Sequence, residues 1–225
     1  MKVLGLIPAR GGSQAIKRKN LVDLGGIPLI EWTIRTALGT SLSRIIVSTD
    51  DQEIAEFSQN VGCEVPFMRP NELATGSALA IDVVNHALDF VGEEFDAVMM
   101  LQPTTPFRNK EDIENAIKII GDSSSVISVV SVEGAHPARM KYIEEGILID
   151  PPFAERVENM PRQELREVFI RNGAIYLTKV PFLRKMTFKG TESLALVMPP
   201  ERSINIDSEF DLKVARAIFS TQMSN

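Results

Sequence analysis

The feature that most constrains the fold is a series of short apolar runs that alternate with amphipathic segments. Residues 3–9 and 95–101 are almost continuously hydrophobic, residues 44–50 are a short apolar run that ends in polar residues, and segments of helical period follow these runs along the chain. Strands that are apolar on both sides belong to parallel sheets whose two faces are covered by helices. The alternation therefore predicts an α/β fold with a doubly wound, mostly parallel sheet.

The same periodicities predict the remaining elements. Helices are expected at 29–38, 51–60, 78–91, 110–120, 179–185 and 208–219, and further strands at 125–132, 173–177 and 194–198. Weaker strand candidates stand at 21–24 and 64–68. Pro28 suits the first turn of its helix and Gly39 the stop after it, which supports these boundaries.

One segment departs from the alternation. Residues 134–170 carry many charges and only scattered apolar residues, with prolines at Pro137, Pro151, Pro152 and Pro161. A loop of about 35 residues without a role would be unusual in a compact domain. We therefore expect residues 1–225 to form a single domain with an inserted arm or flap at about 134–170.

Composition limits the compartment and the partners. The chain has 225 residues, 44% of them hydrophobic, and a net charge of -6, which argues against general affinity for nucleic acid or anionic membranes. The single Cys63 excludes an internal disulfide and fits a reducing compartment. No apolar run approaches the ~18 residues that span a bilayer, and no signal-like segment precedes the first strand, so a cytoplasmic location is expected.

Polar residues stand at the ends of the predicted strands, where ligands bind in open parallel sheets. In chain order they are Arg10 with Gly11 and Gly12, Asp50, Gln102 with Thr104 and Thr105, and Asp207. One edge of the sheet is thus expected to gather cations, backbone donors, neutral polar groups and a carboxylate.

The loop after the first strand suits a polyphosphate. Glycines let backbone N–H groups approach phosphate oxygens, and the planar fork of Arg10 can bind two of them. For a nucleoside triphosphate, Lys17, Arg18 and Lys19 would add positive charge around a leaving pyrophosphate. The loop matches neither G-x-x-x-x-G-K-[ST] nor G-x-G-x-x-G, and the missing second pattern argues against a dinucleotide oxidoreductase.

Each candidate also has a purely structural interpretation. The cationic loop could be a solvated surface. Asp207 could cap the last helix, although Ser208 and Asp211, three residues apart, offer a cap of their own. Asp50 could serve only to fix the turn between its strand and the next helix, and Gln102 could hydrogen-bond the backbone of its own loop.

Several short motifs, spread over nearly the whole chain, stand in an order found in one known family. They are residues 6–13 (LIPARGGS), 19–20 (KN), 46–51 (IVSTDD), 69–70 (RP), 101–108 (LQPTTPFR), 172–176 (NGAIY) and 206–207 (ID). This set resembles the acylneuraminate cytidylyltransferases, the CMP-sialic acid synthetases. The resemblance implies a Rossmann-like nucleotidyltransferase fold and a homodimer in which the arm packs across the partner subunit.

The resemblance also implies a reaction and a set of site residues. The anomeric hydroxyl of a 2-keto-3-deoxy sugar acid would attack the α-phosphorus of CTP, with Mg²⁺ assisting and pyrophosphate leaving. The implied nucleotide-binding residues are Arg10, Gly11, Gly12, Ser13, Lys19, Asn20, Arg69 and Ser77. The implied sugar-binding residues are Gln102, Arg139, Lys141, Arg162 and Arg171, the implied metal ligand is Asp207, and the implied catalytic residues are Arg10, Lys19 and Asp207.

Two positions depart from the family pattern. Asn205 stands where sialic acid enzymes often have the first Asp of Asp-Ile-Asp, so Mg²⁺ is expected to rest on Asp207, substrate phosphates and water. Arg171 stands one position later than the arginine of the Arg-Pro-Asn-Gly form found in some members. This shift leaves its role open, and it leaves room for a sugar other than ordinary sialic acid.

The expected function is activation of a nonulosonic acid such as sialic, legionaminic or pseudaminic acid. A GDP-forming enzyme acting on a sugar 1-phosphate is one alternative, and a KDO-type enzyme is another. The KDO branch carries an acidic residue near the Gln102-Pro103-Thr104 position, which this chain lacks. A glycosyltransferase would be expected to place Asp-x-Asp there, and a non-catalytic nucleotide-binding protein is a further possibility.

Overall fold

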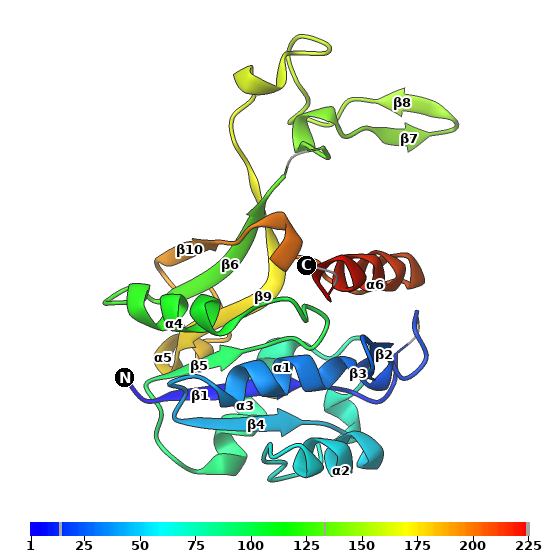
Figure 1. The fold of residues 1–225 in the computed structure, drawn as a ribbon. Helices are drawn as coiled ribbons and strands as arrows, with labels where there is room; N and C mark the ends of the chain where they lie inside the picture. The colour runs from blue at the N-terminus through cyan, green and yellow to red at the C-terminus, as the bar shows by residue number, and fades with distance from the viewer. Residues whose placement is uncertain (14, 133, 224–225) are drawn as a thin grey trace.

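A six-stranded sheet forms the centre of the protein (Figure 1). The computed structural model describes residues 1–13, 15–132 and 134–223. The strands are β1 (Val3–Pro8), β4 (Arg44–Ser48), β5 (Ala97–Met100), β6 (Ser125–Ser131), β9 (Phe169–Lys179) and β10 (Ser193–Val197). Their order across the sheet is β10-β6-β9-β5-β1-β4.

The sheet is mixed but mostly parallel. Strand β1 runs parallel to both β4 and β5, and β10 runs parallel to β6. Strand β9 lies between β5 and β6 and is antiparallel to both. The predicted α/β fold is therefore confirmed, and the segment predicted as a strand at 173–177 lies within the longer β9.

Helices cover both faces of the sheet. They are α1 (Leu29–Leu38), α2 (Gln52–Asn60), α3 (Ala80–Val91), α4 (Lys110–Ile119), α5 (Val180–Leu183) and α6 (Glu209–Met223), close to the predicted ranges. Figure 1 shows α1 and α4 in front of the sheet and α3 and α5 behind it. Within the described residues, we find no helix with the length and apolar character needed to cross a membrane.

Two apolar clusters sandwich the sheet. Along β1, Val3 and Ile7 belong to the cluster shared with α1 and α4, whereas Leu4 and Leu6 belong to the one shared with α3. Because both faces are buried, the strand reads as an uninterrupted apolar run. A third cluster, which includes Ile206, ties α6 to the chain around residues 16–29.

Two weaker strand predictions need correction. Residues 64–68 do not form a strand and contribute only isolated bridges at Glu64 and Met68. Pro66 has no N–H to donate to a ladder, which limits pairing there. Residues 21–24 are split between a 3-10 helix (Lys19–Leu21) and the two-residue β2 (Asp23–Leu24), which pairs with β3 (Ile27–Pro28).

The arm between β6 and β9 projects from the sheet (Figure 1). It contains short 3-10 turns and a hairpin of β7 (Tyr142–Glu144) and β8 (Ile147–Ile149), which the sequence did not predict. Ile143 and Leu148 face each other across this hairpin and are exposed. A two-stranded hairpin is marginal by itself in water, so this one needs a surface to pack against.

Replacement of Ile34 by Ala tests the central core. Ile34 is fully buried in α1, so we expect the variant to lose about 2–5 kcal/mol of unfolding free energy in urea titrations followed by circular dichroism. Leu79→Ala is the matched control, because Leu79 is exposed and its loss is expected to stay within about 0.5 kcal/mol. Equal losses in the two variants would contradict this assignment of the core.

Candidate active site

A pocket of about 400 Å³ opens at the carboxyl ends of β1 and β5. It is lined by Pro8, Arg10, Lys19, Asn20, Arg69, Ala80, Met100, Gln102, Pro103, Thr104, Asn205 and Asp207. Segments from the first, middle and last parts of the chain therefore meet where the sheet places its ligands. The lining combines three cations with one carboxylate and several neutral polar groups.

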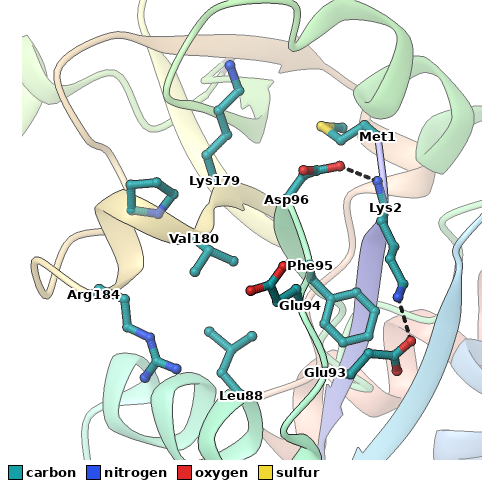
Figure 2. Close-up of a pocket in the computed structure, with 11 residues that line it drawn as sticks. Met1, Lys2, Leu88, Glu93, Glu94, Phe95, Asp96, Lys179, Val180 and Arg184 are labelled. Atoms are coloured by element: carbon teal, nitrogen blue, oxygen red, sulfur yellow. Dashed lines mark hydrogen bonds and ion pairs between the residues drawn. The ribbon is translucent and has the colours of Figure 1, made fainter.

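A larger pocket of about 940 Å³ lies at the opposite ends of the same strands (Figure 2). Its lining includes Lys2, which precedes β1, and Asp96, which precedes β5. Three of its charges already have partners: Lys2 pairs with Glu93 at 2.6 Å, and the Asp96 carboxylate accepts from the backbone N–H of Lys2 at 2.6 Å. Ligands of open parallel sheets bind at the other edge, so the smaller pocket is the candidate site.

Carboxylates at the β4–α2 junction fix the loop after β1. The backbone N–H of Gly11 donates to Asp50 Oδ1 at 3.0 Å. A Cβ on Gly11 would lie 2.6 Å from Asp51 Oδ2, so the loop can pass Asp51 only with glycine there. Asn20 is buried and its Nδ2 donates to the carbonyl oxygen of Arg10 at 2.9 Å. Asp50 thus anchors the loop after β1, a contact that differs from the predicted role of fixing the turn between its own strand and the next helix.

Two arginines form the cationic side of the pocket. Arg10 Nη1 donates to the carbonyl oxygen of Thr75 at 2.8 Å. Arg69 is buried and its Nε donates to Ser48 Oγ at 3.0 Å. Burial lowers the pKa of Arg69 to about 10, an effect that Asp50 opposes and Arg10 reinforces. The Arg69 guanidinium is therefore charged at neutral pH, and guanidinium groups can bind phosphate oxygens.

Asp207 stands opposite these cations. Its Oδ1 lies 3.0 Å from Lys19 Nζ, and its Oδ2 accepts from Asn205 Nδ2 at 2.6 Å. The cap of α6 is made by Ser208 and Asp211, because Ser208 N donates to Asp211 Oδ2 at 2.8 Å and Asp211 N donates to Ser208 Oγ at 3.2 Å. The Asp207 side chain therefore faces the pocket and is not the helix cap.

Asp207 and Asn205 are the residues that could hold a cation. The Oδ1 oxygen of Asn205 is buried and has no hydrogen-bond partner in the parts of the chain that the structure describes. Carboxylate and amide oxygens are hard ligands that suit Mg²⁺. The described residues contain no group of three or more His, Cys, Asp or Glu that could hold a metal. The donor set fits a Mg²⁺ ion that also takes oxygens from a bound substrate.

Four predicted nucleotide residues do not line the pocket itself: Gly11, Gly12, Ser13 and Ser77. Gly12 is exposed, and none of the described atoms lies within 4 Å of a Cβ built on it. Ser77 Oγ lies 3.2 Å from Thr75 Oγ1, next to the carbonyl group that holds Arg10. Gly11, Gly12 and Ser13 follow Arg10 directly in the chain.

The predicted sugar-binding cations of the arm stand apart from the pocket of their own chain. Arg139 Nη2 donates to the carbonyl oxygen of Met160 at 2.9 Å, and Lys141 pairs with Asp150. Arg162 lines a separate cavity at the base of the arm. The structure therefore brings Gln102 to the nucleotide residues, and it does not bring these three cations there within one chain.

Two further cations also point elsewhere. Arg171 lines a pocket of about 590 Å³ with Met186 and Phe188, on the face covered by α5. Arg18 pairs with Glu53 at 2.8 Å and thus serves the start of α2. Of the cations at 17–19, only Lys19 lines the candidate site.

The sequence analysis missed how closely the site depends on β9. Gly173 in that strand has a φ of +81°, and a Cβ there would lie 2.7 Å from Gln102 Oε1. The backbone N–H of Ile206 donates to the carbonyl oxygen of Thr104 at 2.8 Å, which links the loop after β5 to the segment carrying Asp207. A glycine inside an apolar strand was the available signal for this close approach.

Comparison with known proteins places the chain in a family. A family model described as "Cytidylyltransferase" matches residues 4–143. The chain belongs to the cytidylyltransferase family. It is 33% identical over 224 residues to the CMP-N,N'-diacetyllegionaminic acid synthase of Legionella pneumophila, a match that covers 94% of this chain and 93% of that protein.

Two other comparisons define how far the likeness extends. The N-acylneuraminate cytidylyltransferase of Escherichia coli is 31% identical over 220 residues, which are 96% of this cytidylyltransferase but only 52% of the E. coli protein. The chain therefore spans about half the length of that relative. A solved structure of a CMP:2-keto-3-deoxy-manno-octonic acid synthetase complexed with CTP shares the fold with a TM-score of 0.75 at 18% identity, over 99% of this chain and all of that one.

Substitutions of Asp50 distinguish an anchoring role from a role as catalytic base. An Asn side chain keeps an oxygen that can accept from Gly11 N–H, so we expect Asp50→Asn to retain CTP-dependent pyrophosphate release within about threefold. Asp50→Ala removes the acceptor and should lower the rate by about tenfold or more. If Asp50 acted as a catalytic base, the two variants would be equally inactive, and that outcome would contradict the anchoring role.

Proposed function

We propose that this cytidylyltransferase activates a nonulosonic acid, converting CTP and a sialic-like 2-keto-3-deoxy sugar acid into a CMP-sugar and pyrophosphate. The observation that carries the proposal is the pocket in which Arg10, Arg69 and Lys19 face Asp207 at the carboxyl edge of the sheet. Family membership and the legionaminic and neuraminic acid relatives support the choice of CTP and of the sugar class.

The chemistry asks the protein for positioning and charge neutralisation. The sugar hydroxyl oxygen forms a bond to the α-phosphorus, the hydroxyl loses its proton, and the bond from the α-phosphorus to the bridging oxygen of pyrophosphate breaks. No covalent protein nucleophile is needed. Arg10 and Lys19 would stabilise the negative charge that develops on the departing pyrophosphate, and Arg69 would hold the nucleotide.

The contact between Lys19 and Asp207 fits a site that rearranges when substrate binds. In the structure the two side chains neutralise each other across 3.0 Å. A triphosphate would offer Lys19 a stronger anionic partner and release the Asp207 carboxylate for a cation. Mg²⁺, held by Asp207 with Asn205 and substrate oxygens, would supply further neutralisation of phosphate charge.

The sugar acid brings its own carboxylate to an anionic triphosphate, so its binding needs a cation. Gln102 is the pocket residue proposed to contact the sugar. We propose that Arg139, Lys141 and Arg162 reach the sugar carboxylate from the arm of a second subunit, since they stand apart from the pocket of their own chain.

Exposed apolar side chains on the arm support a homodimer. Tyr142, Ile143, Ile147 and Leu148 on the hairpin have exposed fractions of 51%, 72%, 66% and 68%. An apolar hairpin of this kind, isolated from the sheet, is best explained by contact with another copy of the chain.

The single buried Cys63 agrees with the proposed cytoplasmic location.

Lys19→Met tests the nucleotide half of the site. Pyrophosphate release should require CTP, Mg²⁺ and a sugar acid from a panel of sialic, legionaminic and pseudaminic acids. We expect Lys19→Met to lower kcat by about a hundredfold, since a donor to the leaving group is lost. Lys118→Met, which removes an exposed lysine of α4, is the matched control and should behave as the parent does.

The same assay, repeated with KDO and with GTP and a sugar 1-phosphate, gives the results that would overturn the proposal. Turnover with GTP and a sugar 1-phosphate, but with no combination of CTP and a sugar acid, would favour the GDP-forming alternative. Turnover with KDO, and with none of the other sugar acids, would favour the KDO-type alternative.

A double substitution in the arm tests the dimer. Ile143→Ser with Leu148→Ser removes apolar area from one hairpin face, so sedimentation should show a dimer for the parent and a monomer for the variant. Because dissociation of the dimer removes the second subunit's arm from the site, we expect the sugar acid KM of the variant to rise. Leu38→Ser, at an exposed end of α1, is the control and should remain dimeric. A fully active monomeric parent would contradict the shared site.

A further inference from the structure

Arg108 is a buried cation without an ion-pair partner. It is 2% exposed, and none of the described carboxylates lies within ion-pairing distance of it. Asp112, the acidic residue that acts on it through space, instead forms an ion pair with Arg202 at 3.0 Å. Burial lowers the pKa of Arg108 to about 9, partly opposed by Asp112, so the guanidinium is charged at neutral pH. An unpaired buried charge normally costs stability.

The guanidinium group is held by backbone carbonyl groups and by the hydroxyl groups of Thr33 and Thr105. Its Nη1 donates to the carbonyl oxygens of Gln102 at 3.0 Å, Thr105 at 3.2 Å and Ala174 at 3.2 Å. Its Nη2 donates to Thr33 Oγ1 at 2.8 Å. One planar fork thus joins α1, the loop after β5 and β9.

These bonds hold the backbone of Gln102, and Gly173 leaves space for its side chain. Its carbonyl group is held by Arg108, and its side-chain amide lies against Gly173, where a Cβ would come within 2.7 Å of Oε1. The same loop continues to Thr104, whose carbonyl oxygen accepts from Ile206 N–H at 2.8 Å. A shift of the fork would therefore move the wall of the pocket that contains Gln102.

We propose that Arg108 is a positioning residue that sets Gln102 for recognition of the second substrate. The inference rests on the proposed function, in which Gln102 faces the sugar acid. Arg108 does not line the pocket and acts only through the loop that it holds. Lysine cannot replace the fork, since an ammonium group is a point donor that cannot bridge the same carbonyl groups.

Steady-state kinetics test the proposal. Arg108→Lys is expected to raise the sugar acid KM by about tenfold and to change the CTP KM by less than about twofold. Thr33→Val removes one acceptor of the fork and should raise the sugar acid KM by about threefold. If Arg108→Lys fails to fold, the KM values of Thr33→Val test the proposal instead. The control is Arg202→Lys, which alters an arginine of the 3-10 turn Pro200–Arg202 that donates to Asp112 of α4, and it should leave both KM values unchanged.

A double-mutant cycle with Gln102→Ala distinguishes positioning from a general loss of structure. Without the Gln102 side chain, Arg108→Lys or Thr33→Val should change the sugar acid KM by less than about twofold. An equal rise in the presence and absence of that side chain, or a rise in Arg202→Lys that matches the rise in Arg108→Lys, would overturn the proposal.

A spectroscopic readout separates this inference from the proposed function. If the parent shows no turnover with any sugar acid, the proposed function fails, and the side-chain amide resonance of Gln102 in the ligand-free protein then tests Arg108. Gln102→Ala assigns that resonance by its disappearance. It should shift in Arg108→Lys or Thr33→Val and stay in place in Arg202→Lys. An unshifted resonance in the first two variants would overturn the positioning role.

Discussion

The pairing of β9 with two neighbours is the constraint on which the rest of the structure depends. This strand joins the β10–β6 pair to the β5-β1-β4 group, and without it the sheet would fall into two parts. Because it runs antiparallel to both neighbours, its first residues reach the edge where the parallel strands end. The arm enters the sheet through this strand, and Gly173 and Ala174 bring it against the loop that carries Gln102.

The elements that repeat a simple period could be predicted from the sequence. Apolar runs such as 95–101 marked the buried strands, and the polar residues after them marked the edge that holds the candidate site. Periodicity carries no sign of strand direction, so the antiparallel course of β9 could not be predicted. The hairpin in the arm was missed because its apolar residues do not face a core of their own chain.

The same limit applies to single side chains. Sequence could group Arg18 with Lys19, but only the fold shows that Arg18 turns to Glu53 while Lys19 turns to Asp207. Asp50 stands where the sequence predicted it, at the end of its strand. Its contact with the N–H of Gly11 supports an anchoring role. Arg108 belongs to the motif at 101–108. Its hydrogen bond to the carbonyl oxygen of Gln102 depends on how that loop bends, which residue spacing does not predict.

The candidate site combines three cations with one carboxylate, and one of these cations, Lys19, pairs with Asp207. Lys19 and Asp207 are separated by 188 positions and meet because α6 packs beside the loop after β1. The central claim is that this site joins the hydroxyl oxygen of a sugar acid to the α-phosphorus of CTP. Mass spectrometry of the products from a sugar acid labelled with ¹⁸O at the anomeric hydroxyl tests it most directly. The account predicts that the heavy oxygen is retained in a CMP-sugar and absent from pyrophosphate; labelled pyrophosphate, or an unlabelled CMP-sugar, would contradict it.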